Sequence, residues 1–224
     1  EVETGREHST LGSLEGIDFQ QGPRLAFHPG GRLLAYARGP WSGIWDLATK
    51  EEFPIPYTGE HHFLPDGKWL LVVSSDGILR ADIRMRPGGE AVEVELGPPR
   101  LLAPGYWTGG SLSRDGKRLA AVNGAEGKGI ILGLDEPSRS CEFKVPGASA
   151  STAFSPEGGW LALGTWKGEG VEVRNARDGA HLKTLEAGMS AGVQFCPTFP
   201  RLLTTGENLL SLWECGTWRL IRQE

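Results

Sequence analysis

The chain of 224 residues has few cysteines, no long apolar run and no excess of positive charge. Its cysteines, Cys141, Cys196 and Cys215, are odd in number and show no C-x-x-C spacing. This pattern argues against a disulfide framework and is typical of reduced thiols in a cytosol-like compartment. Cys196 and Cys215 fall in the same repeat. We expect them to be small buried apolar residues rather than a disulfide or a metal pair.

The absence of any stretch of about 18 apolar residues predicts that no helix spans a membrane. No signal peptide is present in this sequence, although a start without methionine leaves open that one was lost. The net charge of −5 and the pI near 5.6 argue against a general nucleic-acid binder, because such proteins need a basic face. A local basic patch remains open. We therefore expect a cytoplasmic protein that binds neither nucleic acid nor membranes.

The sequence also lacks common enzyme signatures, since G-x-S-x-G, G-x-x-x-x-G-K-[ST] and H-E-x-x-H are all missing. The one dense pair of metal-ligand residue types is His61-His62. Adjacent side chains on a strand point to opposite faces, so these rings would not easily bind one metal, although in a loop they could. Asp135-Glu136 is interpreted as a turn after a strand rather than an acid–base pair. We expect no enzyme activity, no cofactor and no metal.

What the sequence does contain is a short phrase that occurs five times, with starts 36 to 49 residues apart. Each copy is a tight polar turn followed by an apolar run. Repetition at this spacing indicates blades, solenoid units or arrays. The copies are PGGRLLA (29–35), PDGKWLL (65–71), RDGKRLA (114–120), PEGGWLA (156–162) and PTFPRLL (197–203).

Each phrase predicts a β-hairpin, because two short apolar runs flank a turn rich in glycine and proline. The run 69–73 is apolar at every position and should form a strand buried on both faces. A third run, as at Trp45-Asp46, and a closing fourth run follow in most copies. Four short strands per repeat predict an all-β fold, a β-propeller of four-stranded antiparallel blades. The closing runs are 53–57, 92–96, 141–145, 181–185 and 218–221.

The repeats divide the chain into five blades and one additional strand. Glu1–Gly5 matches the segments that follow the tryptophan position in other copies, so we expect it to belong to the outer strand of a preceding blade. Either the chain is a piece of a longer protein with a propeller of about seven blades, or the ring closes within these residues. We favour the first alternative. The expected boundaries are 1–16 for the outer strand and 17–57, 58–96, 97–146, 147–187 and 188–224 for blades 1 to 5.

These features resemble the WD-repeat (tryptophan–aspartate repeat) β-propeller family over roughly residues 17–224. The phrases AFHPGGRLLA, AFSPEGGWLA and QFCPTFPRLL and the pairs Trp45-Asp46 and Trp213-Glu214 carry the resemblance. Only one pair is literally Trp-Asp, and the Gly-His pair that opens many family repeats is missing. The family implies a scaffold for protein interactions, and the phrase copies resemble bacterial members that are often joined to signalling proteins. The alternative is the group of shorter propellers related to periplasmic Tol proteins, which shares PDGKWL.

Several aromatic residues stand in connections between strands rather than in strands. Trp45 and Trp213 hold the family tryptophan position and should be structural. In the family layout, the links that contain Trp41, Trp107 and Trp166 gather on one face, and Trp107 ends a long link, 97–108. Exposed aromatics are enriched at interaction hot spots, so we predict that this face binds a protein or peptide. Its expected residues are Trp41, His61, His62, Tyr106, Trp107, Trp166, Lys167 and Glu207, with Glu126, Lys128 and Glu169 at a rim of mixed charge.

Two alternatives to a binding module remain open. The chain could be part of a propeller enzyme, such as a lactonase or hydrolase, which would place ligands at the entrance of the central channel. The residues expected there are mostly small and uncharged, which disfavours this alternative. The chain could also be a purely structural segment of a larger ring. The entrance residues are Pro23-Arg24, His61-His62, Gly109-Gly110, Ser149-Ala150 and Ala191-Gly192.

Overall fold

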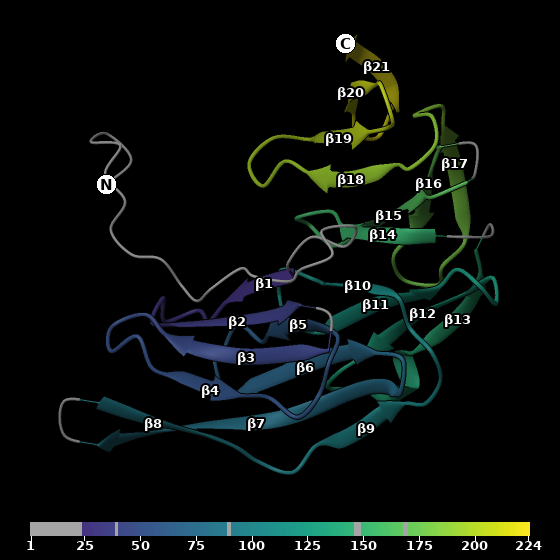
Figure 1. The fold of residues 1–224 in the computed structure, drawn as a ribbon. Coiled ribbons are helices and arrows are strands. Elements are labelled where there is room, and N and C mark those ends of the chain that lie inside the picture. Colours follow the sequence, from purple (N-terminus) through teal and green to yellow (C-terminus); the bar gives the residue numbers. More distant parts are fainter. Residues whose placement is uncertain (1–23, 39, 89–90, 146–148, 168–169) are drawn as a thin grey trace, which may run out of the picture.

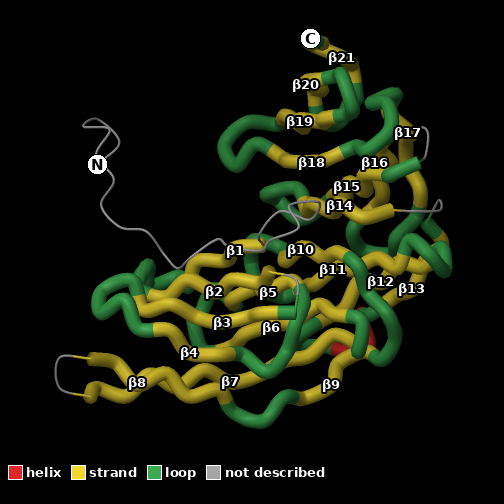
Figure 2. Tube along the Cα trace, viewed as in Figure 1, coloured by secondary structure: helices red, strands yellow, loops and turns green. Residues whose placement is uncertain are grey.

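The computed structural model describes residues 24–38, 40–88, 91–145, 149–167 and 170–224. Across these residues the chain is strand and turn, with one short 3₁₀ helix, η2 (Pro137–Arg139) (Figure 2). The strands form five antiparallel sheets that follow one another along an open arc (Figure 1). The sequence prediction of a β-propeller with antiparallel blades is confirmed. The strand predicted within residues 1–16 lies outside the described residues.

The blades follow the order of the chain, and the first strands of neighbouring blades adjoin along the inner side of the arc. The strands are β1 (Arg24–Phe27), β2 (Leu33–Arg38), β3 (Trp41–Asp46) and β4 (Glu52–Pro54) in blade 1; β5 (Glu60–Phe63), β6 (Trp69–Ser74), β7 (Gly77–Gly88), β8 (Ala91–Leu96) and β9 (Arg100–Ala103) in blade 2; β10 (Gly109–Leu112), β11 (Arg118–Asn123), β12 (Lys128–Gly133) and β13 (Cys141–Lys144) in blade 3; β14 (Ser149–Phe154), β15 (Trp160–Thr165), β16 (Val171–Asn175) and β17 (His181–Leu185) in blade 4; and β18 (Gly192–Phe195), β19 (Arg201–Thr205), β20 (Leu210–Glu214) and β21 (Arg219–Gln223) in blade 5.

The recurring phrase forms the turn between the first and second strand of each blade. In four copies the third residue of the phrase is a glycine at positive φ, which a residue with a Cβ adopts only with strain. Its N–H donates to the carbonyl oxygen three residues earlier, at 2.8 to 2.9 Å. The shared turn explains why the phrase is so regular. These glycines are Gly31, Gly67, Gly116 and Gly158.

Apolar packing between neighbouring blades forms the core. In β6, Leu70 and Val72 pack in the core shared with blade 1, whereas Leu71 and Val73 pack in the core shared with blade 3. The prediction that the run 69–73 is buried on both faces is therefore confirmed for its last four residues, while Trp69 is half-buried. Two further cores join blade 3 to blade 4 and blade 4 to blade 5.

The Trp-Asp pair of blade 1 stabilises the turn that follows β3. The Asp46 side chain is fully buried and accepts hydrogen bonds from the Arg32 guanidinium at 2.7 to 2.9 Å and from the Ala48 N–H at 2.9 Å. The hydrogen bonds from Arg32 hold the pKa of Asp46 below its usual range. Trp213 is buried between blades 4 and 5, and its indole N–H donates to the Thr204 hydroxyl at 2.9 Å. Asp46 and Trp213 therefore have structural roles.

Blade 2 departs from the expected pattern, in which 92–96 closes the blade and 97–108 is a link. The twelve-residue strand β7 continues beyond the sheet, and β8 pairs only with its distal half, from Ile83 onward. The proximal half, Ile78–Arg80, would then lack an outer partner, and β9 occupies that edge. The segment 97–108 is thus partly a strand of blade 2.

No helix in the described residues is both long and apolar enough to cross a membrane.

We expect replacement of Leu161 by Ala to lower the free energy of unfolding by about 2–5 kcal/mol, because Leu161 is fully buried between blades 3 and 4 and its loss leaves a cavity. Urea denaturation monitored by circular dichroism measures the change. Leu182→Ala, at an exposed leucine of the same blade, is the control and should change it by less than about 0.5 kcal/mol. Equal effects of the two substitutions would contradict this packing.

Candidate partner-binding face

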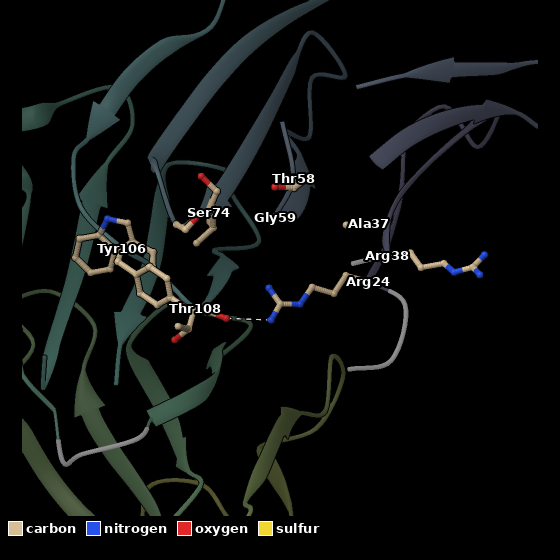
Figure 3. A pocket seen from close by; sticks show the side chains of 11 residues that line it. Arg24, Ala37, Arg38, Thr58, Gly59, Ser74, Tyr106 and Thr108 are labelled. Carbon is tan, nitrogen blue, oxygen red and sulfur yellow. Dashed lines mark hydrogen bonds between the residues drawn. The ribbon is translucent and has the colours of Figure 1, made fainter. Parts of the chain in front are cut away.

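A cavity of about 230 Å³ opens where the connections of blades 1, 2 and 3 meet. This side of the blades, which carries the links between blades and those between second and third strands, is called the top face here. The cavity is lined by the start of β1, the end of β2, the end of β6 and the segments that precede β5 and β10 (Figure 3). Its lining residues are Arg24, Ala37, Arg38, Thr58, Gly59, Val73, Ser74, Ser75, Tyr106, Trp107 and Thr108.

Local backbone contacts position this lining. Ser74, at the end of β6, donates from its hydroxyl to the Gly77 carbonyl oxygen at 2.9 Å, while its own carbonyl oxygen accepts from the Trp107 N–H at 3.0 Å. At Gly59, a Cβ would clash with the carbonyl oxygen of Val73, so the chain can pass this close to β6 only because the residue is glycine. The cavity wall is thus held by the strands themselves.

Arg24 crosses the cavity from blade 1 toward blade 3 (Figure 3). Its guanidinium donates to the Thr108 carbonyl oxygen at 3.0 Å and lies 3.5 Å from the Glu60 carboxylate. The same Glu60 oxygen accepts the Gly110 N–H at 2.9 Å. These contacts join the first strands of three blades, and the charge of Arg24 is balanced by that of Glu60. The side chain of Arg38 points away from the other labelled residues in Figure 3.

The two aromatic residues of the link before β10 differ in exposure. Tyr106 is exposed beside the cavity, whereas Trp107 is only 8% exposed and packs in the core between blades 2 and 3. The expectation that Trp107 is an exposed anchor is therefore wrong: β9 and the hydrogen bond to Ser74 draw its backbone onto the blade, and burial of the indole among aliphatic side chains follows. The Trp107 indole N–H has no hydrogen-bond partner within the described part of the chain.

The remaining predicted aromatic and charged residues form two groups. Trp41 is highly exposed at the start of β3, where it pairs with Arg38 of the cavity lining but does not line the cavity itself. Trp166 and Lys167 are exposed on blade 4, apart from this cavity. The Trp166 carbonyl oxygen accepts from the Ser190 N–H at 2.9 Å, and the Glu207 N–H donates to the Met189 carbonyl oxygen at 3.1 Å. Glu207 therefore belongs with Trp166.

Three further charged residues were predicted at the rim of the face, and two of them lie within the described part of the chain. Glu126 and Lys128 form an ion pair with each other at 2.9 Å on blade 3, and both are exposed. Glu169 lies outside the described residues. Of the predicted residues, Tyr106 and Trp107 line the cavity of blades 1 to 3, Trp41 lies next to its lining, and Trp166 and Glu207 lie on blades 4 and 5.

The two histidines occupy opposite faces of β5, as expected for adjacent strand residues. His61 is buried, with Nε2 3.4 Å from the Tyr57 carbonyl oxygen, and burial lowers its pKa to about 4. His62 faces Glu60, with 3.7 Å between its Nε2 and the carboxylate, and burial lowers its pKa as well. The side chain of His61 is therefore not exposed on the top face. Among the described residues, no cluster of three or more His, Cys, Asp or Glu side chains could hold a metal ion.

The cavity also contains polar residues that sequence analysis did not select as binding residues. Hydroxyl side chains stand at the end of the second strand of blade 2 and just before the first strands of blades 2 and 3. Superposition of the repeats at these strand ends would have placed them together on the top face, whereas attention to aromatic residues alone did not. They are Thr58, Ser74, Ser75 and Thr108.

Comparison with known proteins supports the fold and does not show a function. No family model and no curated protein sequence matches the chain. A chain in a solved structure described as "Crystal Structure of Mitotic Checkpoint Complex" is similar, with a TM-score of 0.71 and 15% sequence identity. The match covers 90% of this chain and 64% of that one, so our chain spans less than two thirds of its neighbour. At this level of identity the likeness concerns the fold.

We expect the free energy of unfolding to fall as the pH is lowered from 6.5 to about 4, the ordinary and the folded-state pKa of His61. In this interval the unfolded chain binds a proton that the buried ring excludes, so acid favours unfolding. The full shift corresponds to about 3 kcal/mol. His61→Leu should flatten the pH dependence of the free energy of unfolding, because the titrating ring is removed. Leucine is a suitable replacement, since Leu25 and Val193 occupy the same position in blades 1 and 5. Urea denaturation at several pH values measures it.

The exposed His181 of β17 provides a matched control. His181→Gln should leave the pH dependence of stability between 6.5 and 4 as it is in the parent chain. Identical pH profiles for His61→Leu and the parent chain would show that the His61 ring does not titrate as its burial requires.

Proposed function

We propose that the chain is a non-catalytic interaction domain of the WD-repeat type, which binds a protein or peptide on the top face of blades 1 to 3. The observation that carries the proposal is the cavity of about 230 Å³ with the exposed Tyr106 at its edge and the exposed Trp41 next to its lining. A rigid cavity beside exposed aromatic rings is suited to an anchor side chain surrounded by further apolar contacts.

The polar groups of the cavity suit a peptide better than a reaction. Thr58 and Ser75 offer hydroxyls that can both donate and accept hydrogen bonds, as a peptide backbone requires. Of the charged residues that line the cavity, Arg24 is engaged with Glu60 and with a backbone carbonyl oxygen, and the side chain of Arg38 points away from the other labelled residues in Figure 3. This arrangement favours binding over acid–base chemistry. Further parts of the proposal are membership of the WD-repeat family, a cytoplasmic location and a place in a larger signalling or regulatory protein.

The partner would be recognised chiefly through aromatic contacts. A Tyr or Trp that is fully desolvated at the centre of an interface contributes about 2 kcal/mol or more, which corresponds to about a 30-fold change in affinity. Trp41 is 71% exposed and Tyr106 is 49% exposed in the free protein, so both side chains can lose further exposed surface on binding. Trp107 supports the cavity from beneath and is not expected to touch the partner directly.

The test is an affinity capture from the source organism followed by mass spectrometry, with the parent chain and a Trp41→Ala, Tyr106→Ala variant. We expect at least one protein to be retained by the parent chain and lost by the variant, with an affinity lower by at least about 30-fold, the contribution of one such residue, when the purified pair is titrated. Trp166→Ala, at an exposed tryptophan of blade 4, is the matched control and should retain the partner. Equal retention by all three proteins would contradict a binding site at this cavity.

A further inference from the structure

A second cavity, of about 380 Å³, opens on the bottom face, the side of the blades that carries the turns between first and second strands. It lies between blades 4 and 5, and the turn of blade 3 reaches its edge, where the Arg114 guanidinium donates to the Pro197 carbonyl oxygen at 3.4 Å. A volume in this range with mostly apolar walls is typical of pockets for small molecules. The apolar wall residues are Pro156, Trp160, Phe195, Pro197, Phe199 and Pro200.

A thiol stands in this cavity at a position that is buried in the other blades. The residue that follows the first strand of each blade donates its N–H to the carbonyl oxygen five residues later. In blades 1 to 4 this residue is at most 6% exposed, and in blades 3 and 4 it is a serine whose hydroxyl accepts a backbone N–H of the turn, at Ser113 and Ser155. In blade 5 it is Cys196, which is partly exposed. The expectation that Cys196 is buried is therefore wrong.

The turn of blade 5 accounts for this difference, because its copy of the recurring phrase is the one without glycine. In the other four copies the glycine N–H donates to the carbonyl oxygen of the equivalent residue and closes the turn. In blade 5 the Arg201 N–H donates to the Phe199 carbonyl oxygen at 2.7 Å instead. The Thr198 hydroxyl lies 3.7 Å from the Cys196 sulfur. The altered turn thus brings hydrogen-bond donors to a partly exposed sulfur.

The surroundings of Cys196 favour its thiolate form, unlike those of the other two cysteines. Hydrogen bonds from the Thr198 N–H, the Thr198 hydroxyl and the Phe199 N–H lower the pKa of Cys196. Burial raises the pKa of Cys141, and it raises the pKa of Cys215 to about 11. Because the thiolate is the form that acts as a nucleophile, Cys196 is the most reactive of the three thiols.

Cys215 lines the same cavity, but it is not placed to form a disulfide with Cys196. Strand β19 and its turn run between them: the Cys196 N–H donates to the Arg201 carbonyl oxygen at 3.0 Å, and the Cys215 N–H donates to the Pro200 carbonyl oxygen at 2.9 Å. Two strand spacings amount to about 10 Å. A disulfide requires Cα atoms within about 7 Å. The reaction partner of Cys196 is therefore a molecule that enters the cavity from solvent.

We propose that this cavity binds small apolar molecules of the α,β-unsaturated carbonyl class and that Cys196 forms a covalent adduct with them. The Cys196 thiol gives its proton to water, and its sulfur attacks the β-carbon of the bound molecule. The sulfur–carbon bond forms as the π bond of the alkene breaks, and that electron pair moves to the α-carbon, which takes a proton from water. No oxidant is consumed. The aromatic and proline walls hold the apolar body of the molecule beside the sulfur.

This site is independent of the proposed top-face cavity, since it lies on the opposite face of the blades and shares no lining residue with that cavity.

Reaction of the full chain with N-benzylmaleimide, an apolar α,β-unsaturated carbonyl compound, tests the proposal at neutral pH by mass spectrometry of the intact chain and its peptides. We expect the first adduct on Cys196, formed faster than those on Cys141 and Cys215 by about tenfold or more. Its rate should level off as the probe concentration rises, because the cavity fills before the bond forms. The hydrophilic N-(2-hydroxyethyl)maleimide should react more slowly at Cys196 and without levelling off.

Three variants separate the roles of the nucleophile, the donors and the wall. Cys196→Ser should lose the fast adduct and stay folded, since serine holds this position in blades 3 and 4. Thr198→Val removes a donor to the sulfur and should move the half-maximal rate to higher pH. Phe199→Ala, at an exposed wall residue, should raise the half-saturating concentration of N-benzylmaleimide about tenfold and leave the rate with the hydrophilic maleimide unchanged.

Cys141→Ser is the matched control and should react at Cys196 like the parent chain, because Cys141 lies outside this cavity. Equal reactivity of the three cysteines would overturn the proposal. A Cys196 rate that rises linearly with probe concentration and is the same for the two maleimides would overturn it as well, since the cavity would then have no part in the reaction.

Discussion

The packing of each sheet against the next is the interaction on which the rest of the structure depends. A four-stranded sheet with apolar side chains on both faces cannot bury them alone, and each internal blade solves this by sharing one core with each neighbour. β6 shows the requirement most clearly, because alternate residues of one short strand supply two different cores. The polar turns and the buried Asp46 then only have to position strands that burial already holds together.

The candidate binding site is a consequence of this packing. Its walls are strand ends and short links from three consecutive blades, so its shape depends on how those blades are fixed to one another. The contacts of Arg24 with Thr108 and Glu60 cross between blades at the same place. Loops on a rigid strand framework can carry binding groups without disturbing the core, which is consistent with hydroxyls and an exposed tyrosine at this surface.

The elements that recur in every repeat could be predicted from the sequence. Features that depend on contact with one particular neighbouring strand or blade were missed. The phrase predicted the hairpin turns because glycine at its third position has a backbone role that is independent of context, as at Gly31. The strand β9 was missed because the proximal half of β7 is open to an outer partner only where β8 pairs with the distal half instead. Trp107 was expected to be exposed because a link residue gives no sign of whether it contacts solvent or a core, and only the packing of blades 2 and 3 decides this.

Native-state hydrogen exchange followed by mass spectrometry tests the central claim, that stability arises between neighbouring blades. Within the described residues, blade 3 packs against a blade on both sides, whereas blades 1 and 5 each pack against one. The account predicts the slowest exchange in β10, β11 and β12 and faster exchange in the central strands of blades 1 and 5. Exchange in blades 1 and 5 as slow as in blade 3 would contradict it.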